Sequence, residues 1–284
     1  MMRGMFAAIS GLKVHQTMLD VTANDIANVN TVGFKSERVS FKDALSQMQK
    51  GASGPTTTLG GTNAIQIGLG VQLGGIDNEM QSGSLQSTGN PLDVAIQGDG
   101  FFRVTDDPAN IAGGTAQTFY TRAGNFGSDS NGDLVTSDGY YVLGYQVDSS
   151  TGAVTSPLTQ TKITIPADSQ SVSIGQDGVV TAIDSSGVAT KLGAISLAKF
   201  PNDAGLERVS GNRFQASNNS GAEVAGTAGT SGLGTIVPGS LEMSNVDLAQ
   251  EFTNMITAQR GFQANSRVIT TADQMLQELV NLKQ

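Results

Sequence analysis

Apolar residues recur at every seventh position near both ends of the chain, a spacing that places side chains on one face of an α-helix. The N-terminal series is Met5, Leu12, Leu19 and Ile26, and the C-terminal series is Leu248, Met255, Phe262, Ile269 and Leu276. The two patterns predict helices from about residue 4 to 28 and from about residue 245 to the last turn. We predict that the two series face each other and supply the subunit contacts.

Local signals bound both predicted helices. The turn-favouring run from Asn28 to Gly33 ends the first, because Asn and Gly favour turns over helix. The second is preceded by Ser244-Asn245-Val246-Asp247, which has the form of a capping box, so we expect this helix to begin near Asn245.

Between the helices the periodicity changes to that of strands. Six segments rich in Val, Ile, Phe and Tyr predict strands, at residues 92–97, 101–105, 140–147, 162–165, 179–183 and 194–200. Four dipeptides that suit tight hairpin turns separate them: Asp99-Gly100, Asn131-Gly132, Asp138-Gly139 and Asp177-Gly178. These signals predict a central antiparallel all-β domain.

The fold class we expect is therefore α+β. Residues 1–33 and 245–284 are predicted to form a coiled-coil-like helical domain, and residues 92–216 the β domain. Residues 34–91 and 217–244, which hold runs rich in Gly, Ser and Thr, are predicted to be extended connectors.

Composition excludes several function classes. The chain has 284 residues, no Cys and one His, which excludes disulfides, thiolate chemistry and a His-pair metal site within one chain. A net charge of −9 argues against nucleic-acid binding. The N-terminus lacks the apolar core of a signal peptide, and the longest uncharged run, residues 51–76, is too polar for a membrane span. We expect no catalytic residue, no cofactor and no metal ion.

The C-terminal helix needs partners to persist. Forty helical residues extend about 60 Å, longer than a small domain is wide. One narrow apolar stripe offsets only part of the entropy lost by ordering so many residues. We therefore expect other copies of the chain to cover it. An intramolecular coiled coil that closes a monomer is the alternative.

Three segments resemble one known family. They are Gly11 to Lys35, Leu92 to Phe126, where the run from Leu92 to Phe102 and the run from Tyr120 are most similar, and Met243 to Leu276. They are similar to the signatures of bacterial flagellar rod and hook proteins. Residues 60–71 and 144–146 resemble hook proteins more than distal-rod proteins, although the chain is too short for a large outer domain.

The resemblance implies a structural function. It implies a flagellar hook subunit that polymerises helically into the curved, flexible tube coupling motor and filament, which also serves as an export channel. A distal-rod subunit, part of the drive shaft, is the alternative. The implied partners are further copies of the chain, the distal rod protein, the hook cap protein, the hook–filament junction protein and the flagellar type III export apparatus. The implied location is the hook and basal body, outside the cell, without signal-peptide cleavage.

Three more specific interpretations of the sequence have weaker support. Asp129-x-Asn131-x-Asp133 begins like a calcium loop, but Leu134 and Tyr140 stand where that loop needs Gly and Glu. A carbohydrate-binding or hydrolytic protein would need aromatic platforms or paired carboxylates, and the chain has no Trp. Asn218-Asn219-Ser220 matches a glycosylation triplet by pattern alone.

Overall fold

The computed structural model describes residues 2–55, 60–108, 117–148, 154 and 160–282. It divides into two compact units. Unit 1 comprises residues 1–27, 37–77 and 247–284, and unit 2 comprises residues 28–36 and 78–246.

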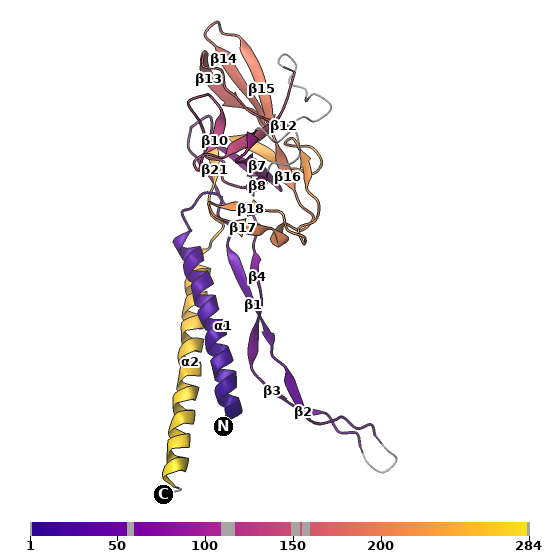
Figure 1. Cartoon of the computed structure of the whole chain (residues 1–284), viewed down its shortest axis with the longest axis vertical. Helices are drawn as coiled ribbons and strands as arrows, with labels where there is room; N and C mark the ends of the chain where they lie inside the picture. The colour runs from indigo at the N-terminus through magenta and orange to yellow at the C-terminus, as the bar shows by residue number, and fades with distance from the viewer. Residues whose placement is uncertain (1, 56–59, 109–116, 149–153, 155–159, 283–284) are drawn as a thin grey trace. The chain divides into compact units, whose positions relative to one another are not determined.

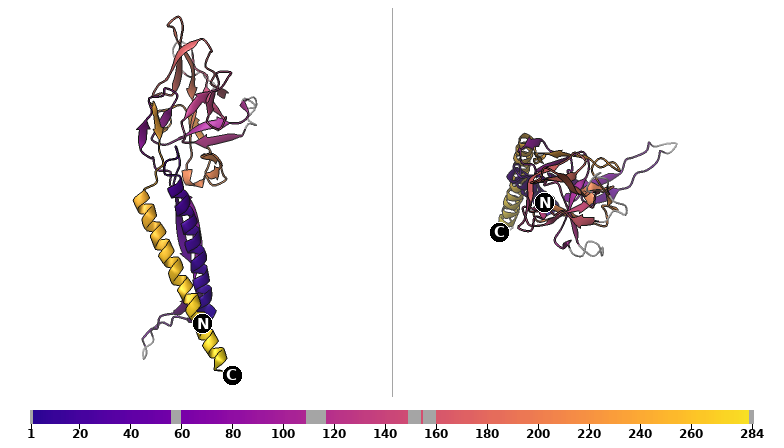
Figure 2. Two further views of the ribbon diagram at one scale, coloured as in Figure 1. Left: turned by 90° about the vertical axis from the view of Figure 1, so that its left-hand side faces the viewer. Right: turned by 90° about the horizontal axis from the view of Figure 1, so that it is seen from above.

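Unit 1 consists of two long helices and a β-hairpin. Its elements are α1 (Met2–Ala27), β1 (Glu37–Asp43), β2 (Ser46–Lys50), β3 (Ile65–Gly68), β4 (Val71–Asn78) and α2 (Leu248–Asn281). Strand β1 pairs with β4 and β2 with β3, so residues 37–78 form one long hairpin. Helices α1 and α2 lie side by side and antiparallel, with both chain termini at the same end of the pair (Figure 1). The second view agrees (Figure 2).

Unit 2 is an antiparallel β structure. Its elements are β5 (Leu85–Ser87), β6 (Val94–Gln97), β7 (Phe101–Thr105), β8 (Thr118–Thr121), β9 (Phe126–Ser128), β10 (Leu134–Thr136), β11 (Tyr141–Tyr145), β12 (Gln160–Lys162), β13 (Ser169–Ile174), β14 (Val179–Asp184), β15 (Ala189–Ile195), β16 (Leu197–Lys199), the 3₁₀-helix η2 (Asp203–Gly205), β17 (Glu207–Val209), β18 (Arg213–Gln215), β19 (Val224–Gly226), β20 (Thr235–Pro238) and β21 (Ser240–Glu242). The main sheet runs β13-β14-β15-β11-β7-β8-β18-β17. Strands β9, β10, β12, β16 and β19 branch from it, and β6 pairs with β20 and β5 with β21. Two terminal helices with this sheet confirm the α+β fold class.

Three of the four predicted turn dipeptides close hairpins. Gly132, Gly139 and Gly178 have φ near +80° and link β9 to β10, β10 to β11 and β13 to β14, each an antiparallel pair. Gly100 also has a positive φ of 129°, but its neighbours β6 and β7 pair with other strands. A dipeptide can therefore indicate the turn without indicating which strands pair.

The core of unit 2 has two parts. The larger cluster holds mostly Val, Ile, Leu and Phe side chains from both halves of the sheet, including fully buried Val94, Phe102 and Val180. A smaller cluster joins Phe101, Tyr120, Ala198, Phe200, Leu206 and Phe214. In it, Tyr120 and Phe200 meet edge to face with ring centroids 4.7 Å apart, a favoured aromatic geometry.

Two boundaries differ from the sequence prediction. Helix α2 begins at Leu248 rather than near Asn245, because Asp247 is its N-cap: the Asp247 carboxylate accepts from the N–H groups of Ala249 (2.9 Å) and Gln250 (3.3 Å). It ends at Asn281.

The second difference concerns the ranges expected as connectors. Residues 34–91 contain β1 to β5, and residues 217–244 contain β19 to β21. Polar, Gly-rich composition resembles a linker, yet strand pairing needs only backbone groups. Part of the first range, residues 56–59, lies outside the described residues. The division into the three predicted domain ranges stays a prediction.

Candidate assembly surfaces

Small residues bring α1 and α2 close together. Ala8, Ala258 and Ala272 are all nearly inaccessible to solvent, at 4%, 0% and 6% exposure. A Cβ atom built on Gly11 would lie 2.5 Å from Asn265 Nδ2, and one built on Gly261 would lie 2.5 Å from the His15 ring. Both distances are too short for real contacts, so a side chain at either glycine would displace the Asn265 or His15 side chain.

The predicted seven-residue series occupies the edges of this contact. Among the described residues, Met5, Leu12, Leu19, Ile26, Met255, Ile269 and Leu276 are half-buried, whereas Leu248 and Phe262 are 40% and 37% exposed. Besides Gly11, Val14, Thr22 and Asp25 of α1, the buried positions of the two helices are alanines that come three residues after members of the series, at Ala8, Ala258 and Ala272. Sequence reasoning missed them because alanine contributes little to a hydrophobic pattern. Pair-by-pair facing of the two series stays a prediction.

His15 fills the space opposite Gly261. Its ring meets Phe41 of β1 edge to face with centroids 6.2 Å apart. Its Nδ1 atom is buried and has no hydrogen-bond partner among the described residues. His15 therefore packs between α2 and the hairpin.

Unit 1 leaves many large apolar side chains exposed. On α2, Leu248, Phe252 and Ile256 form one row at intervals of four residues, which we call the Leu248 row. Its members are 40–58% exposed. A second row near the end of α2, which we call the terminal strip, consists of Met275, Leu279 and Leu282 at 47%, 50% and 83% exposure. Apolar patches of this kind mark interaction surfaces on soluble proteins.

The hairpin presents a third apolar surface. Gln47 lies opposite Ile67 in the β2–β3 pair, so the alternation of a strand places Ile65, Ile67 and Leu69 on the face that carries Gln47 and Leu45. The four apolar residues are 39–79% exposed. We call these four the hairpin face.

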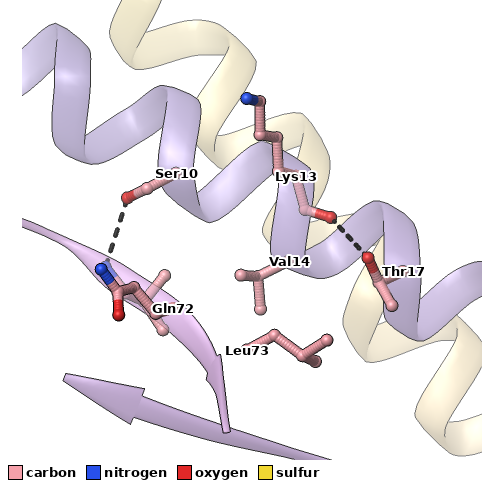
Figure 3. A pocket seen from close by; sticks show the side chains of 7 residues that line it. Ser10, Lys13, Val14, Thr17, Gln72 and Leu73 are labelled. Carbon is pink, nitrogen blue, oxygen red and sulfur yellow. Dashed lines mark hydrogen bonds between the residues drawn. The ribbon is translucent and has the colours of Figure 1, made fainter. Parts of the chain in front are cut away.

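A pocket of about 310 Å³ lies between α1 and β4 (Figure 3). Its lining residues are Ser10, Lys13, Val14, Thr17, Val71, Gln72 and Leu73. The Val71 N–H donates to Ser10 Oγ at 3.2 Å, which ties β4 to α1. In Figure 3 the Val14 and Leu73 side chains point toward each other, while the Lys13 side chain points away from them. We call this pocket the α1–β4 groove.

Unit 2 contains a buried ionic cluster that joins distant parts of the chain. Lys35 Nζ donates to Glu242 Oε1 (2.6 Å), and Arg122 Nη1 donates to Glu242 Oε2 (3.2 Å). The side chains of Lys35 and Glu242 are completely buried and that of Arg122 is 4% exposed. Burial lowers the pKa of Lys35, although the Glu242 carboxylate opposes that shift. We call these three residues the ionic clamp.

Backbone groups complete the ionic clamp. The Gly83 N–H donates to Glu242 Oε1 (3.0 Å), and Lys35 Nζ also donates to the Gln81 carbonyl (2.7 Å). Gly33, with φ +68°, lies so close to the Arg122–Ala123 backbone that an added Cβ would come within 2.5 Å of the Ala123 nitrogen. Sequence patterns gave no sign of this cluster, since its three charged residues lie far apart in the sequence.

Asn245 acts beside the clamp rather than in the helix predicted for it. Its Oδ1 accepts from the Ser36 N–H (2.8 Å), and its Nδ2 donates to the Glu79 carbonyl (2.8 Å). The side chain thus links three segments of unit 2.

The calcium-like triplet forms a turn. Asp129 Oδ1 accepts from the N–H groups of Asn131 and Asp133, both at 2.8 Å. The Asp133 carboxylate accepts from Lys162 Nζ and Thr164 Oγ1, each at 2.6 Å. Both carboxylates therefore serve protein hydrogen bonds. Within the described residues, no group of three or more His, Cys, Asp or Glu side chains is placed to hold a metal ion.

Three family models match separate parts of the chain. Residues 5–35 match "Flagella basal body rod protein", residues 95–182 match "Flagellar hook protein FlgE/F/G D1 domain" and residues 237–282 match "Flagellar basal body rod FlgEFG protein C-terminal". Lys35, Arg122 and Glu242 each fall in a different one of these matches. The ionic clamp therefore joins all three matched segments.

Whole-length relatives agree. The chain is 50% identical to the flagellar basal-body rod protein FlgG of Bacillus subtilis over 284 residues, all of both chains. It is 38% identical to FlgG of Borreliella burgdorferi over all of this chain and 99% of that protein. It is 30% identical to the flagellar hook protein FlgE of B. burgdorferi, in an alignment of 441 positions that covers both chains completely.

These matches define a structural component of the bacterial flagellum. The chain belongs to the flagellar rod and hook protein family. Its relatives are named as structural proteins, which agrees with the expectation of a non-enzymatic role. Neither helix of the described chain is long and apolar enough to cross a membrane.

Proposed function

We propose that the chain is a subunit of the flagellar rod, in its distal part, and that it polymerises helically into a hollow drive shaft through which later subunits are exported. The preference for a hook subunit in the sequence analysis has less support than this alternative. The alignment with the rod relative from B. subtilis is 284 positions long, the length of this chain, whereas the alignment with the hook relative is 441 positions long. A chain of this length resembles a rod subunit in size as well as in sequence.

The observation that carries the self-association is the exposed apolar surface of unit 1. The Leu248 row, the terminal strip and the hairpin face are uncovered in the single chain. A contact between two different surfaces of identical subunits does not close on itself and generates a helical filament. Burying these side chains between copies would supply the stability that one helix pair lacks.

The nine predicted contact residues differ in how much exposed surface they offer to other copies. Seven are already half-buried within the chain, so copies can cover only their remaining exposure. Leu248 and Phe262 are the most exposed of the nine and are the best candidates for contacts between copies. Export through the flagellar type III apparatus and a position in the basal body complete the proposal.

Phe262→Asp tests the assembly. A carboxylate at this position would have to be desolvated between copies, so we expect the variant not to polymerise. Sedimentation and electron microscopy of the purified chain measure polymerisation. Tyrosine fluorescence should be unchanged, because all four tyrosines lie between Tyr120 and Tyr145 in unit 2. Gln263→Asp is the matched control, since it places the same charge on the next, exposed position and should polymerise normally. Normal polymers from Phe262→Asp would contradict the proposed contact.

A hook subunit is the second candidate, favoured by residues 60–71 and 144–146 and by the hook relative. Immunogold labelling of isolated flagella distinguishes the two. Label on the straight rod within the basal body supports the rod proposal. Label along the curved hook would overturn it and leave the family assignment intact.

A further inference from the structure

Helix α2 extends beyond the part of the pair that α1 covers. The close contacts of Gly11 with Asn265 and of His15 with Gly261 set an antiparallel register in which the start of α1 lies near residue 274 of α2. The turns after Leu276 therefore have no α1 residue opposite them. The terminal strip, Met275, Leu279 and Leu282, lies at this overhang, and its spacing of four and three residues keeps it on one face.

The α1–β4 groove has the chemistry to receive such a strip. Val14, Val71 and Leu73 provide apolar lining, and Lys13 is the one charged residue among those that line it. A volume of about 310 Å³ lies at the lower end of the range for small-molecule pockets, which suits a few apolar side chains. Lys13 lines the edge of the groove and is exposed, and its side chain points away from Val14 and Leu73 in Figure 3.

We propose that the α1–β4 groove of one copy receives the terminal strip of a second copy. This inference rests on the proposed self-association and names the surfaces that form one of its contacts. The groove and the strip are different surfaces, so the contact repeats from copy to copy without closing.

The chain cannot fill its own groove. The groove spans residues 10–17 of α1, whose register partners on α2 centre near residue 263. Leu279 is about 16 residues farther along α2, or roughly 24 Å at 1.5 Å per residue. A second copy displaced along the helix axis by about that distance would place its terminal strip beside the groove.

Position favours the terminal strip over the row of Leu248, Phe252 and Ile256 as the occupant, since both surfaces have acidic residues beside them. Glu278 is exposed next to Leu279, and a carboxylate there can pair with Lys13 at the groove rim. The terminal strip also projects past α1, so a neighbour can bind it without separating the helix pair. The Leu248, Phe252 and Ile256 row lies at the opposite end of α2.

Paired cysteines test the contact, because the chain has no Cys of its own. Copies carrying only Gln72→Cys are mixed with copies carrying only Leu279→Cys, polymerised and oxidised. A disulfide needs Cα atoms within about 7 Å, so a covalent dimer on a non-reducing gel reports direct apposition between copies. With equal amounts of the two variants mixed at random, only half of the Gln72→Cys copies have a Leu279→Cys neighbour, so we expect up to about half of the chains to run as covalent dimers, and Gln72→Cys mixed with Phe252→Cys to stay monomeric on the gel.

The outcomes separate the two proposals. Polymers that form normally without the Gln72–Leu279 cross-link, or that cross-link through Phe252 instead, overturn the groove contact and leave the rod function standing. A chain that forms no polymer before any substitution overturns the proposed self-association itself.

Charge reversal provides an independent test. We expect Lys13→Glu and Glu278→Lys each to raise the concentration needed for polymerisation several-fold, and the double variant to restore it. Gln277→Lys, which introduces a lysine one residue away while keeping Glu278, is the control for Glu278→Lys. A double variant that polymerises no better than the worse single variant would contradict the proposed pairing.

Discussion

At the residue scale, the ionic clamp brings three of the buried charged residues of unit 2 together in one place. One carboxylate, Glu242, serves two cations, Lys35 and Arg122, and the N–H of Gly83. The N-terminal segment, the middle of the sheet and the last strand thus depend on one side chain. Buried ion pairs are retained more readily for specific placement of segments than for stability, since a well-packed apolar substitute is often as stable.

Glu242→Gln should destabilise unit 2 by about 3–5 kcal/mol, because two cations would remain buried without a countercharge while the Gly83 N–H keeps an acceptor. The measurement is urea unfolding followed by tyrosine fluorescence, which reports unit 2 alone. Adding Lys35→Met to this variant removes one of the stranded cations and should recover part of the loss. Asp99→Asn is the control, since it breaks an exposed pair with Lys199 and should shift the midpoint far less. Equal shifts for the buried and exposed pairs would refute the clamp.

Asp133 should make unit 2 sensitive to acid. Burial raises the pKa of Asp133, but hydrogen bonds from Lys162 and Thr164 outweigh that effect and lower the pKa below its ordinary value. A lowered carboxyl pKa contributes stability that is present above the unfolded pKa of about 3.9 and is lost as the pH falls through the folded value. Asp133→Asn should therefore be less stable than the parent at neutral pH and should lose less stability below about pH 4. Parallel stability curves for the two proteins, measured by tyrosine fluorescence in urea, would exclude this role.

At the scale of elements, heptad spacing identified both helices because residues seven positions apart lie on the same face of a helix, and that face packs against a partner. The contact itself was not predictable from that spacing. Ala258 and Ala272 lie at its centre, and small side chains there reflect how closely the two helices approach, a property of the pair rather than of either sequence segment. The hairpin β1–β4 was missed for a related reason, since its Gly and Thr content resembles that of a linker.

Gly261→Ala tests the close approach. An added methyl would meet the His15 ring, so we expect the thermal midpoint of the helical circular dichroism signal to fall by several degrees. His15→Ala combined with Gly261→Ala removes the obstruction and should recover the midpoint, because alanine is then the better helix former. Gly4→Ala is the control: nothing lies within 4 Å of its Cβ position, so the substitution should raise the midpoint slightly. A rise in both single variants would mean that the helices do not pack as described.

At the scale of the whole molecule, sequence motifs identified the family, and whole-chain comparison shifted the preference from hook to rod. A segment as short as residues 144–146 carries little information for separating two branches of a family, whereas identity along the entire chain averages over every position. The motifs also indicated the segments of the chain that the ionic clamp connects. That Lys35, Arg122 and Glu242 connect them could be seen only in the structure. Glu242 lies just outside the C-terminal motif, which begins at Met243.

The two units should differ in their dependence on assembly, which hydrogen exchange can measure. Unit 2 buries a contiguous apolar core, whereas α1 and α2 share a narrow contact and leave two apolar rows of α2 exposed. In the dilute chain we expect fast exchange in residues 2–27 and 248–281 and slow exchange in residues 94–105 and 179–199, since local stability follows buried apolar contact. In the polymer the helices should become as protected as the sheet, because neighbours cover their exposed side chains. Strong protection of both helices in a proven monomer would mean that the intramolecular pair is sufficient by itself, and assembly would then have to depend on the hairpin face and the terminal strip alone.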